Sequence, residues 1–197
     1  MIKYTLPYLQ TLRLHQWSKN SLIFVPSFIS HQIVDLTLLK LSIILFIAQG
    51  FASSGTYIIN DILDKKTDEF HPDKKHRPIA AGKIPLSIAW VYAGLFIAGS
   101  IFIGSLVSPA IPICLAGYIV MSCFYSTFLK KMVVLDLVLL SFFYIYRILL
   151  GHVGLDIPFS MWLLTFSFFI FFGLATSKRI IELEDSPQNT SSKKIIL

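Results

Sequence analysis

Long apolar stretches constrain the fold of this chain more than any other feature of its sequence. The five strongest are residues 41–59, 86–107, 109–128, 132–150 and 159–177. Each approaches or exceeds the roughly 20 residues that a helix needs to cross about 30 Å of hydrocarbon. A sixth stretch, residues 20–34, is shorter and contains Pro26. Because lipid offers the backbone no hydrogen-bond partners, each stretch is expected to form a helix.

The composition excludes an ordinary soluble domain. Hydrophobic residues make up 55% of the chain and charged residues only 14%, and the mean hydropathy is +0.71. A soluble chain of this length needs more charge to cover its surface. We therefore predict an all-α, multi-pass transmembrane helical bundle of about six helices, in which residues 1–197 form a single membrane domain.

The lysine and arginine residues predict the orientation of the bundle. They gather in four segments, 3–19, 65–83, 130–131 and 178–194, whereas the intervening loops hold only Lys40. Because basic residues beside the spans are retained in the cytoplasm, both termini and a 60–85 loop are expected on the cytoplasmic side of a plasma (inner) membrane. This bias accounts for the net charge of +6, so no nucleic-acid partner is expected.

A polar stripe runs along the second apolar stretch and out of it. Gln49, Ser53, Thr56, Asn60 and Asp64 follow one another at intervals of three or four residues. Since a helix advances about 100° per residue, these side chains share one face. Polar side chains within a membrane face a bundle interior or a wet cavity, so this face is not expected to meet lipid.

The stripe leads into three nearby carboxylates, those of Asp61, Asp64 and Asp68. On a continued helix these acids lie with Asn60 within about 100° of one another. A hard divalent cation is the simplest common partner of such a group, and Mg²⁺ suits a site completed by phosphates and water. The alternative is a solvated loop in which the acids pair with neighbouring lysines. The polar stripe favours the metal site, because a solvated loop does not require a polar face within the membrane.

A basic cluster follows at residues 71–83. Lys74, Lys75 and Arg77 lie there together with His71 and His76. Beside a magnesium site, such cations suit phosphate or diphosphate groups, and the arginine can form a two-pronged contact. The alternative, a patch that attracts anionic lipids, is compatible with the same residues.

These motifs resemble those of a known family. N-D-I-L-D-K-K-T-D at 60–68 is similar to the N-D-x-x-D-x-x-x-D signature of the UbiA-type intramembrane prenyltransferase superfamily. Further segments resemble the branch that contains decaprenyl-phosphate phosphoribosyltransferase. They are L-R-L-H-Q-W-S-K-N at 12–20, H-P-D-K-K-H-R-P-I-A-A-G at 71–82, Y-S-T-F-L-K at 125–130 and K-R-I-I-E-L at 178–183. The superfamily typically has about nine helices, so the chain is expected to lack its C-terminal third.

The resemblance implies a set of site residues. Asn60, Asp61, Asp64 and Asp68 are the expected Mg²⁺ ligands, and Asp61, Asp64, Asp68, Arg77 and Asp136 are the expected catalytic residues. The expected substrate-binding residues are Lys19, Asn60, Lys74, Lys75, Arg77, Lys130, Lys178 and Arg179. Ordinary prenyltransferases of the superfamily carry a second aspartate-rich loop where this chain has Lys178 and Arg179. Basic residues there fit a lipid monophosphate that is held by direct ion pairing.

The resulting hypothesis is Mg²⁺-dependent transfer of a phosphoribosyl group from phosphoribosyl diphosphate to a polyprenyl phosphate, at the cytoplasmic face of the lipid bilayer. Two alternatives stay open. One is transfer of a prenyl chain from its diphosphate to an aromatic acceptor, and the other is a non-catalytic membrane subunit or inactive fragment. Arg147 is expected to lie outside the site, about 16 Å from Asp136 along the same helix, and to snorkel or bind a carbonyl group.

Overall fold

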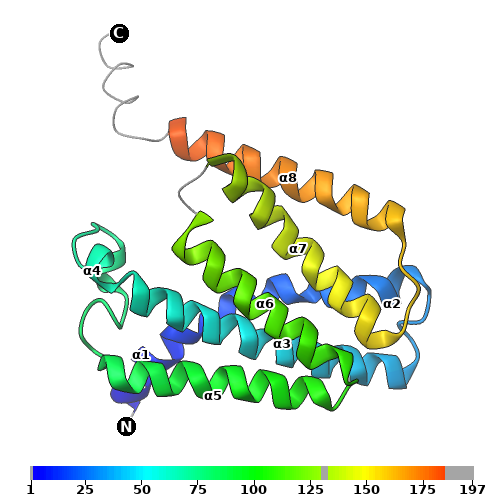
Figure 1. The fold of residues 1–197 in the computed structure, drawn as a ribbon, viewed down its shortest axis with the longest axis horizontal. Coiled ribbons are helices and arrows are strands. Elements are labelled where there is room, and N and C mark those ends of the chain that lie inside the picture. The colour runs from blue at the N-terminus through cyan, green and yellow to red at the C-terminus, as the bar shows by residue number, and fades with distance from the viewer. Residues whose placement is uncertain (1, 130–132, 185–197) are drawn as a thin grey trace, which may run out of the picture.

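The computed structural model describes residues 2–129 and 133–184, and all of the regular structure in these ranges is helical (Figure 1). The helices are α1 (Ile2–Leu12), η1 (Leu14–Phe24), α2 (Val25–Ile29), α3 (Leu36–Leu63), α4 (Lys65–Asp68), η2 (Lys74–His76), α5 (Leu86–Ser105), α6 (Ala110–Thr127), α7 (Val133–Leu155) and α8 (Met161–Glu184). The predicted all-α membrane bundle is confirmed.

Five helices, α3, α5, α6, α7 and α8, are long and apolar enough to cross a membrane. They coincide with the five strongest apolar stretches of the sequence. Their outward faces carry exposed large apolar side chains, among them Phe102, Ile113 and Trp162, which are 68%, 75% and 73% exposed. Such faces are stable only against lipid, so the chain is a multi-pass membrane protein.

The sixth expected span, residues 20–34, was wrong as a single helix. The N-terminal segment, residues 2–29, is instead divided into α1, η1 and α2. Arg13 has a left-handed backbone (φ 50°) that ends α1, and Pro26 lies in the first turn of a new short helix. The three short helices together run along the bundle from the end near α4 to the opposite end (Figure 1).

Helix α3 begins at a defined cap. The Asp35 carboxylate accepts hydrogen bonds from the backbone N–H groups of Thr37 (2.7 Å) and Leu38 (3.2 Å). These bonds satisfy donors that the first turn of a helix leaves without partners. The same bonds, that from Leu38 first, hold the pKa of Asp35 below its ordinary value.

The N-terminal segment packs closely on the long helices because glycines lie at the contacts. A Cβ added at Gly50 of α3 would come within 2.7 Å of the Trp17 ring, and one added at Gly151 of α7 would clash with the backbone of Ile23. Small residues at helix contacts allow this approach within a membrane. Trp17 also donates a hydrogen bond from Nε1 to Ser54 Oγ at 3.0 Å.

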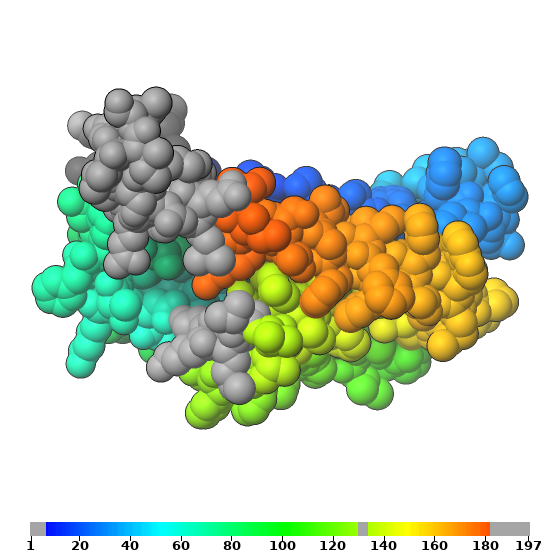
Figure 2. Space-filling view, turned by 90° about the horizontal axis from the view of Figure 1, so that it is seen from above, coloured from blue at the N-terminus to red at the C-terminus, as the bar shows by residue number. Residues whose placement is uncertain are grey.

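The helices bring several polar segments to one end of the bundle. Helices α3, α6 and α8 end there, and α5 and α7 begin there (Figure 1). Helix α8 packs along α7, as the space-filling view also shows (Figure 2). Arg13, the loop at 64–85 and the last turns of α8 therefore share this end.

Candidate functional site

A cavity of about 440 Å³ opens between α3, α4, the N-terminal segment, α6 and α7. Its outer half is lined by Arg13, Asn60, Asp64, Thr67, Asp68, His71, Lys74 and Arg77. Its inner half is lined by Lys19, Thr56, Tyr57, Tyr118, Ser122, Leu140, Phe143, Tyr144 and Arg147. Tyr125 and Ser126, in the last turn of α6, line it nearer the mouth. The cavity thus has an outer half with acidic and basic groups and an inner half rich in tyrosine.

The polar stripe of α3 forms one wall of this cavity. Thr56, Asn60 and Asp64 line it directly, whereas Ser53 and Gln49, one and two turns deeper, are 3% and 0% exposed. The prediction that this face points into the bundle and not toward lipid is confirmed.

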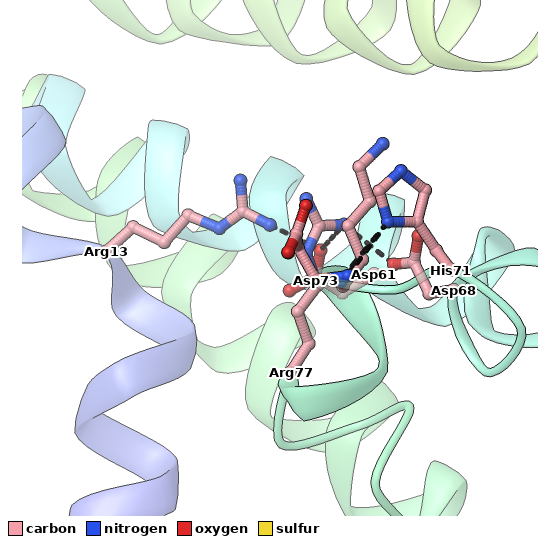
Figure 3. Close-up of polar contacts among 7 residues, drawn as sticks. Arg13, Asp61, Asp68, His71, Asp73 and Arg77 are labelled. Carbon is pink, nitrogen blue, oxygen red and sulfur yellow. Dashed lines mark hydrogen bonds and ion pairs between the residues drawn. The ribbon is translucent and has the colours of Figure 1, made fainter. Parts of the chain in front are cut away.

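An ion-pair network of Arg13, Asp61, Arg77 and Asp68 lies beside the outer half of the cavity (Figure 3). The Asp61 carboxylate, only 2% exposed, accepts hydrogen bonds from Arg13 at 2.5 Å and from Arg77 at 3.1 Å. Arg77 donates a further bond to Asp68 at 2.7 Å. Asp61 therefore points toward two arginines and is absent from the cavity lining, although it belongs to the expected ligand set.

The remaining acidic residues of the motif line the cavity wall. Asp64 and Asp68 both border it together with Asn60. Over residues 2–129 and 133–184, no group of three or more His, Cys, Asp or Glu side chains is assembled for a metal ion. Three oxygen-bearing side chains, one of them an amide, do meet the same space, and this donor set suits a hard cation that keeps phosphate and water ligands.

The basic loop divides into cavity and surface residues. Lys74 and Arg77 line the cavity, whereas Lys75 is exposed and does not. His71 Nδ1 lies 3.2 Å from the backbone N–H of Asp73 and 3.4 Å from that of Lys74 and accepts from both (Figure 3). His71 therefore shapes the loop that carries Lys74.

Arg147, which the sequence led us to expect outside the site, lies in the inner half of the cavity. Arg147 of α7 lines the cavity and is 3% exposed, so its expected position outside the site was wrong. Its guanidinium donates to Asn20 Oδ1 at 2.9 Å and to the Phe143 carbonyl, the latter as expected. The cavity extends along α7 as far as Arg147, which the axial distance from Asp136 did not reveal.

The other expected site residues are distributed as follows. Asp136 accepts a hydrogen bond of 2.5 Å from the Tyr125 hydroxyl, and Tyr125 lines the cavity. Lys19 also lines it. Lys178 and Arg179 lie near the end of α8 and are not among the lining residues. Lys130 falls outside the described residues.

Arg13 and the cavity tyrosines were missed at the sequence level. Arg13 follows α1 at the left-handed break and reaches Asp61 across 48 residues of sequence. The tyrosines were visible as aromatic residues on α3, α6 and α7, but nothing in their spacing distinguishes cavity from core.

The family follows from a direct match. A model described as the UbiA prenyltransferase family covers residues 23–189. This chain belongs to the UbiA prenyltransferase family. The predicted resemblance to the UbiA-type superfamily is confirmed. In this UbiA-family chain the segment at 60–68 spans the end of α3 and the short helix α4, beside the cavity.

Several curated relatives are similar to most of this UbiA-family chain. A decaprenyl-phosphate phosphoribosyltransferase of Mycolicibacterium smegmatis is 35% identical over 182 residues, covering 89% of this chain and 57% of the relative. The nodulation protein NoeC of Azorhizobium caulinodans is 35% identical over 177 residues, with coverage of 89% and 57%. The protein y4nM of Sinorhizobium fredii is 35% identical over 175 residues, with coverage of 89% and 34%. The chain thus spans less than two thirds of the length of these relatives.

Solved structures share the UbiA fold. A UbiA homolog from Archaeoglobus fulgidus bound to DMAPP and Mg²⁺ superposes with a TM-score of 0.67 at 19% identity, covering 84% of this chain and 60% of that one. The same homolog bound to GPP and Mg²⁺ gives a TM-score of 0.66. These similarities confirm the architecture of the bundle.

Proposed function

We propose that this chain carries the donor site of an Mg²⁺-dependent phosphoribosyltransferase, which moves a phosphoribosyl group from phosphoribosyl diphosphate to a polyprenyl phosphate. The observation that carries the proposal is the cavity itself, in which Asn60, Asp64 and Asp68 face Lys74 and Arg77. Relatives named decaprenyl-phosphate phosphoribosyltransferase, 35% identical in one species, indicate the reaction class.

Asn60, Asp64 and Asp68 would hold Mg²⁺ on the diphosphate of the donor, while Asp61 holds Arg13 and Arg77 in place. Mg²⁺ bound there would neutralise charge that develops on the departing diphosphate. The positively charged side chains of Arg77 and Lys74 would contact the same diphosphate. Arg77 contacts Asp68 at 2.7 Å, so a guanidinium that would bind the donor phosphate lies beside a carboxylate that would hold the metal.

The bond changes need little proton transfer. The bond from C1 of the ribose to the diphosphate oxygen breaks, and an oxygen of the lipid phosphate forms the new bond to C1. The lipid phosphate is already an anion near neutral pH, so no general base is required. The cations of the outer half stabilise the leaving diphosphate more in the transition state than in the ground state.

The proposed orientation puts this cavity on the cytoplasmic side, with both termini there. The basic loop at 65–83 and the end of α8 lie at one end of the bundle (Figure 1). Arg13 lies there too, since it contacts Asp61 near the end of α3. Basic residues beside membrane spans favour the cytoplasm, where a phosphorylated sugar donor is available.

Asp64→Asn tests the metal site. The change removes ligand charge but hardly any volume, so the variant should insert and fold normally yet lose transfer. The matched control is Glu69→Gln, because Glu69 is an exposed acid of the same loop that pairs only loosely with Lys65, at 3.7 Å. Diphosphate release and radiolabelled lipid product are measured with Mg²⁺ present. Normal turnover by Asp64→Asn would overturn the assignment.

A second candidate function is prenyl transfer to an aromatic acceptor. It is favoured by one observation, the fold similarity to a homolog bound to the prenyl diphosphates DMAPP and GPP. The same preparation should therefore be given a prenyl diphosphate and an aromatic acid. Product formation there, with no use of the sugar donor, would replace the first proposal, and inertness toward both would indicate a non-catalytic subunit.

The basic end of α8 is proposed to attract the lipid phosphate. Lys178→Ala combined with Arg179→Ala should then raise the KM for polyprenyl phosphate while leaving the KM for the sugar donor unchanged. An equal effect on both substrates would contradict this role.

A further inference from the structure

Within residues 2–129 and 133–184, two cations in the inner half of the cavity, Lys19 and Arg147, have no acidic partner. Arg147 is 3% exposed, and its hydrogen bonds go to the Asn20 side chain, the Phe143 carbonyl and the Tyr118 hydroxyl, all neutral groups. Lys19, half-buried, lies over the Tyr144 ring at 5.7 Å from its centroid. In the described part of the chain, no carboxylate forms an ion pair with either side chain.

The outer half shows the opposite arrangement. There Arg13 and Arg77 are matched by Asp61 and Asp68 at 2.5 to 3.1 Å. Among the described residues, the two arginines near the mouth are therefore paired with carboxylates, whereas Lys19 and Arg147 are not. A cation within the membrane is costly unless an anion accompanies it, so the inner pair is suited to an anion that arrives with a ligand.

The two cations belong to one place. Arg147 Cζ lies 5.9 Å from the centroid of the same Tyr144 ring that Lys19 contacts, and all three residues line the cavity. The cation–π contacts hold both side chains without cancelling their charge. Ser122 and Ser126 of α6 also line the cavity, and hydroxyl groups can donate to an anion.

We propose that Lys19 and Arg147 form a metal-independent subsite for a phosphate monoester. Direct ion pairing by a lysine and a bidentate arginine suits such a group without a cation in between. The inference deepens the proposed function, on which it rests: the end of α8 attracts the second phosphate at the surface, and Lys19 and Arg147 bind it within the bundle. Two sources share this chemistry, the polyprenyl phosphate and the 5-phosphate of the sugar donor. The apolar lining by Leu140 and Phe143 favours the lipid.

Binding without metal tests the subsite. The purified chain in lipid nanodiscs, with EDTA present, is titrated calorimetrically with farnesyl phosphate, with farnesol and with ribose 5-phosphate. We expect farnesyl phosphate to bind and Lys19→Gln to weaken it about tenfold, which corresponds to one charge-assisted hydrogen bond. Lys40→Gln, an exposed lysine at the first turn of α3, is the matched control and should bind as the unaltered chain does.

Arg147→Lys is the second variant, because it keeps the charge and loses the two-pronged geometry. It should weaken farnesyl phosphate binding but leave farnesol binding unchanged. If this variant does not fold, Lys19→Gln decides alone, since Lys19 is only half-buried. If Lys19→Gln weakens the binding of ribose 5-phosphate but not of farnesyl phosphate, the subsite is supported and belongs to the sugar donor.

The outcomes separate this inference from the proposed function. If Lys19→Gln and the unaltered chain bind farnesyl phosphate equally well, and also bind ribose 5-phosphate equally well, the subsite is overturned, even if transfer occurs. Lys19-dependent phosphate binding in EDTA, combined with an absence of phosphoribosyl transfer, would support the subsite and refute the proposed reaction.

Discussion

The pair formed by Arg13 and Asp61 predicts an asymmetric cost of mutation. The Asp61 side chain is 3% exposed, whereas the Arg13 side chain is 22% exposed. Arg13→Gln leaves a buried carboxylate with Arg77 alone, while Asp61→Asn leaves an arginine that can turn toward water. Removing one partner of a buried pair costs about 3–5 kcal/mol, and the remaining Arg77 contact reduces this to roughly 2–3 kcal/mol for Arg13→Gln.

Asp61→Asn should cost less, about 1–2 kcal/mol. Arg77 keeps its bond to Asp68 at 2.7 Å in that variant, and the double variant removes both charges of the pair. The single costs should therefore not add, with a coupling of about 1–2 kcal/mol. The four proteins of this cycle are compared by unfolding in mixed detergent micelles, followed by circular dichroism.

Two results would refute this reasoning. If Asp61→Asn is at least as destabilising as Arg13→Gln, the buried carboxylate is not the costly member of the pair. If the losses of unfolding free energy in the two single variants add up to the loss in the double variant, Arg13 and Asp61 are not coupled. The cycle is also repeated with Mg²⁺ in place of EDTA. If Asp61 is a metal ligand, Asp61→Asn should lower the free energy of unfolding more with Mg²⁺ than with EDTA.

Three shorter predictions concern topology, packing and the metal. In a background without the native cysteines, Thr67→Cys should react with an impermeant thiol reagent from the cytoplasmic side only. Val34→Cys, at the other end of the bundle, should react from the outside only. The reverse labelling pattern would show that the orientation is inverted. Gly151→Ala should lower the thermal midpoint, with about 1–3 kcal/mol of overpacking, whereas Gly94→Ala, whose added Cβ meets nothing within 4 Å, should be neutral or slightly stabilising. Removing Mg²⁺ with EDTA should stop transfer yet preserve phosphate monoester binding, and turnover that persists in EDTA would count against the metal.

Local periodicity explains what the sequence could predict. The five long helices follow from the length of their apolar stretches, and the inward face of α3 follows from polar residues spaced three or four apart. The length of an apolar stretch and the spacing of its polar residues can each be read within a single helix. The motif at 60–68 lies at the end of α3 for the same reason, so its place at the cavity mouth was accessible from the residues alone.

Contacts between distant segments explain what was missed. Arg13 reaches Asp61 across 48 residues, and Arg147 reaches Asn20 across 127. Such pairs depend on how helices pack and rotate, which hydropathy does not encode. The break at Arg13 also depends on a left-handed backbone angle that a non-glycine residue seldom adopts, and hydropathy does not predict it.

The divided N-terminal segment also has a consequence for biogenesis. Its polar residues find their partners on helices made later, since Trp17 bonds Ser54 on α3 and Asn20 bonds Arg147 on α7. At a synthesis rate of roughly 5–20 residues per second, the 127 residues between Asn20 and Arg147 take about 6–25 seconds to appear. Until then the insertion machinery must hold a segment whose amide side chain has no place in lipid. The early part of the polypeptide thus settles into the bilayer only after α7 has emerged from the ribosome.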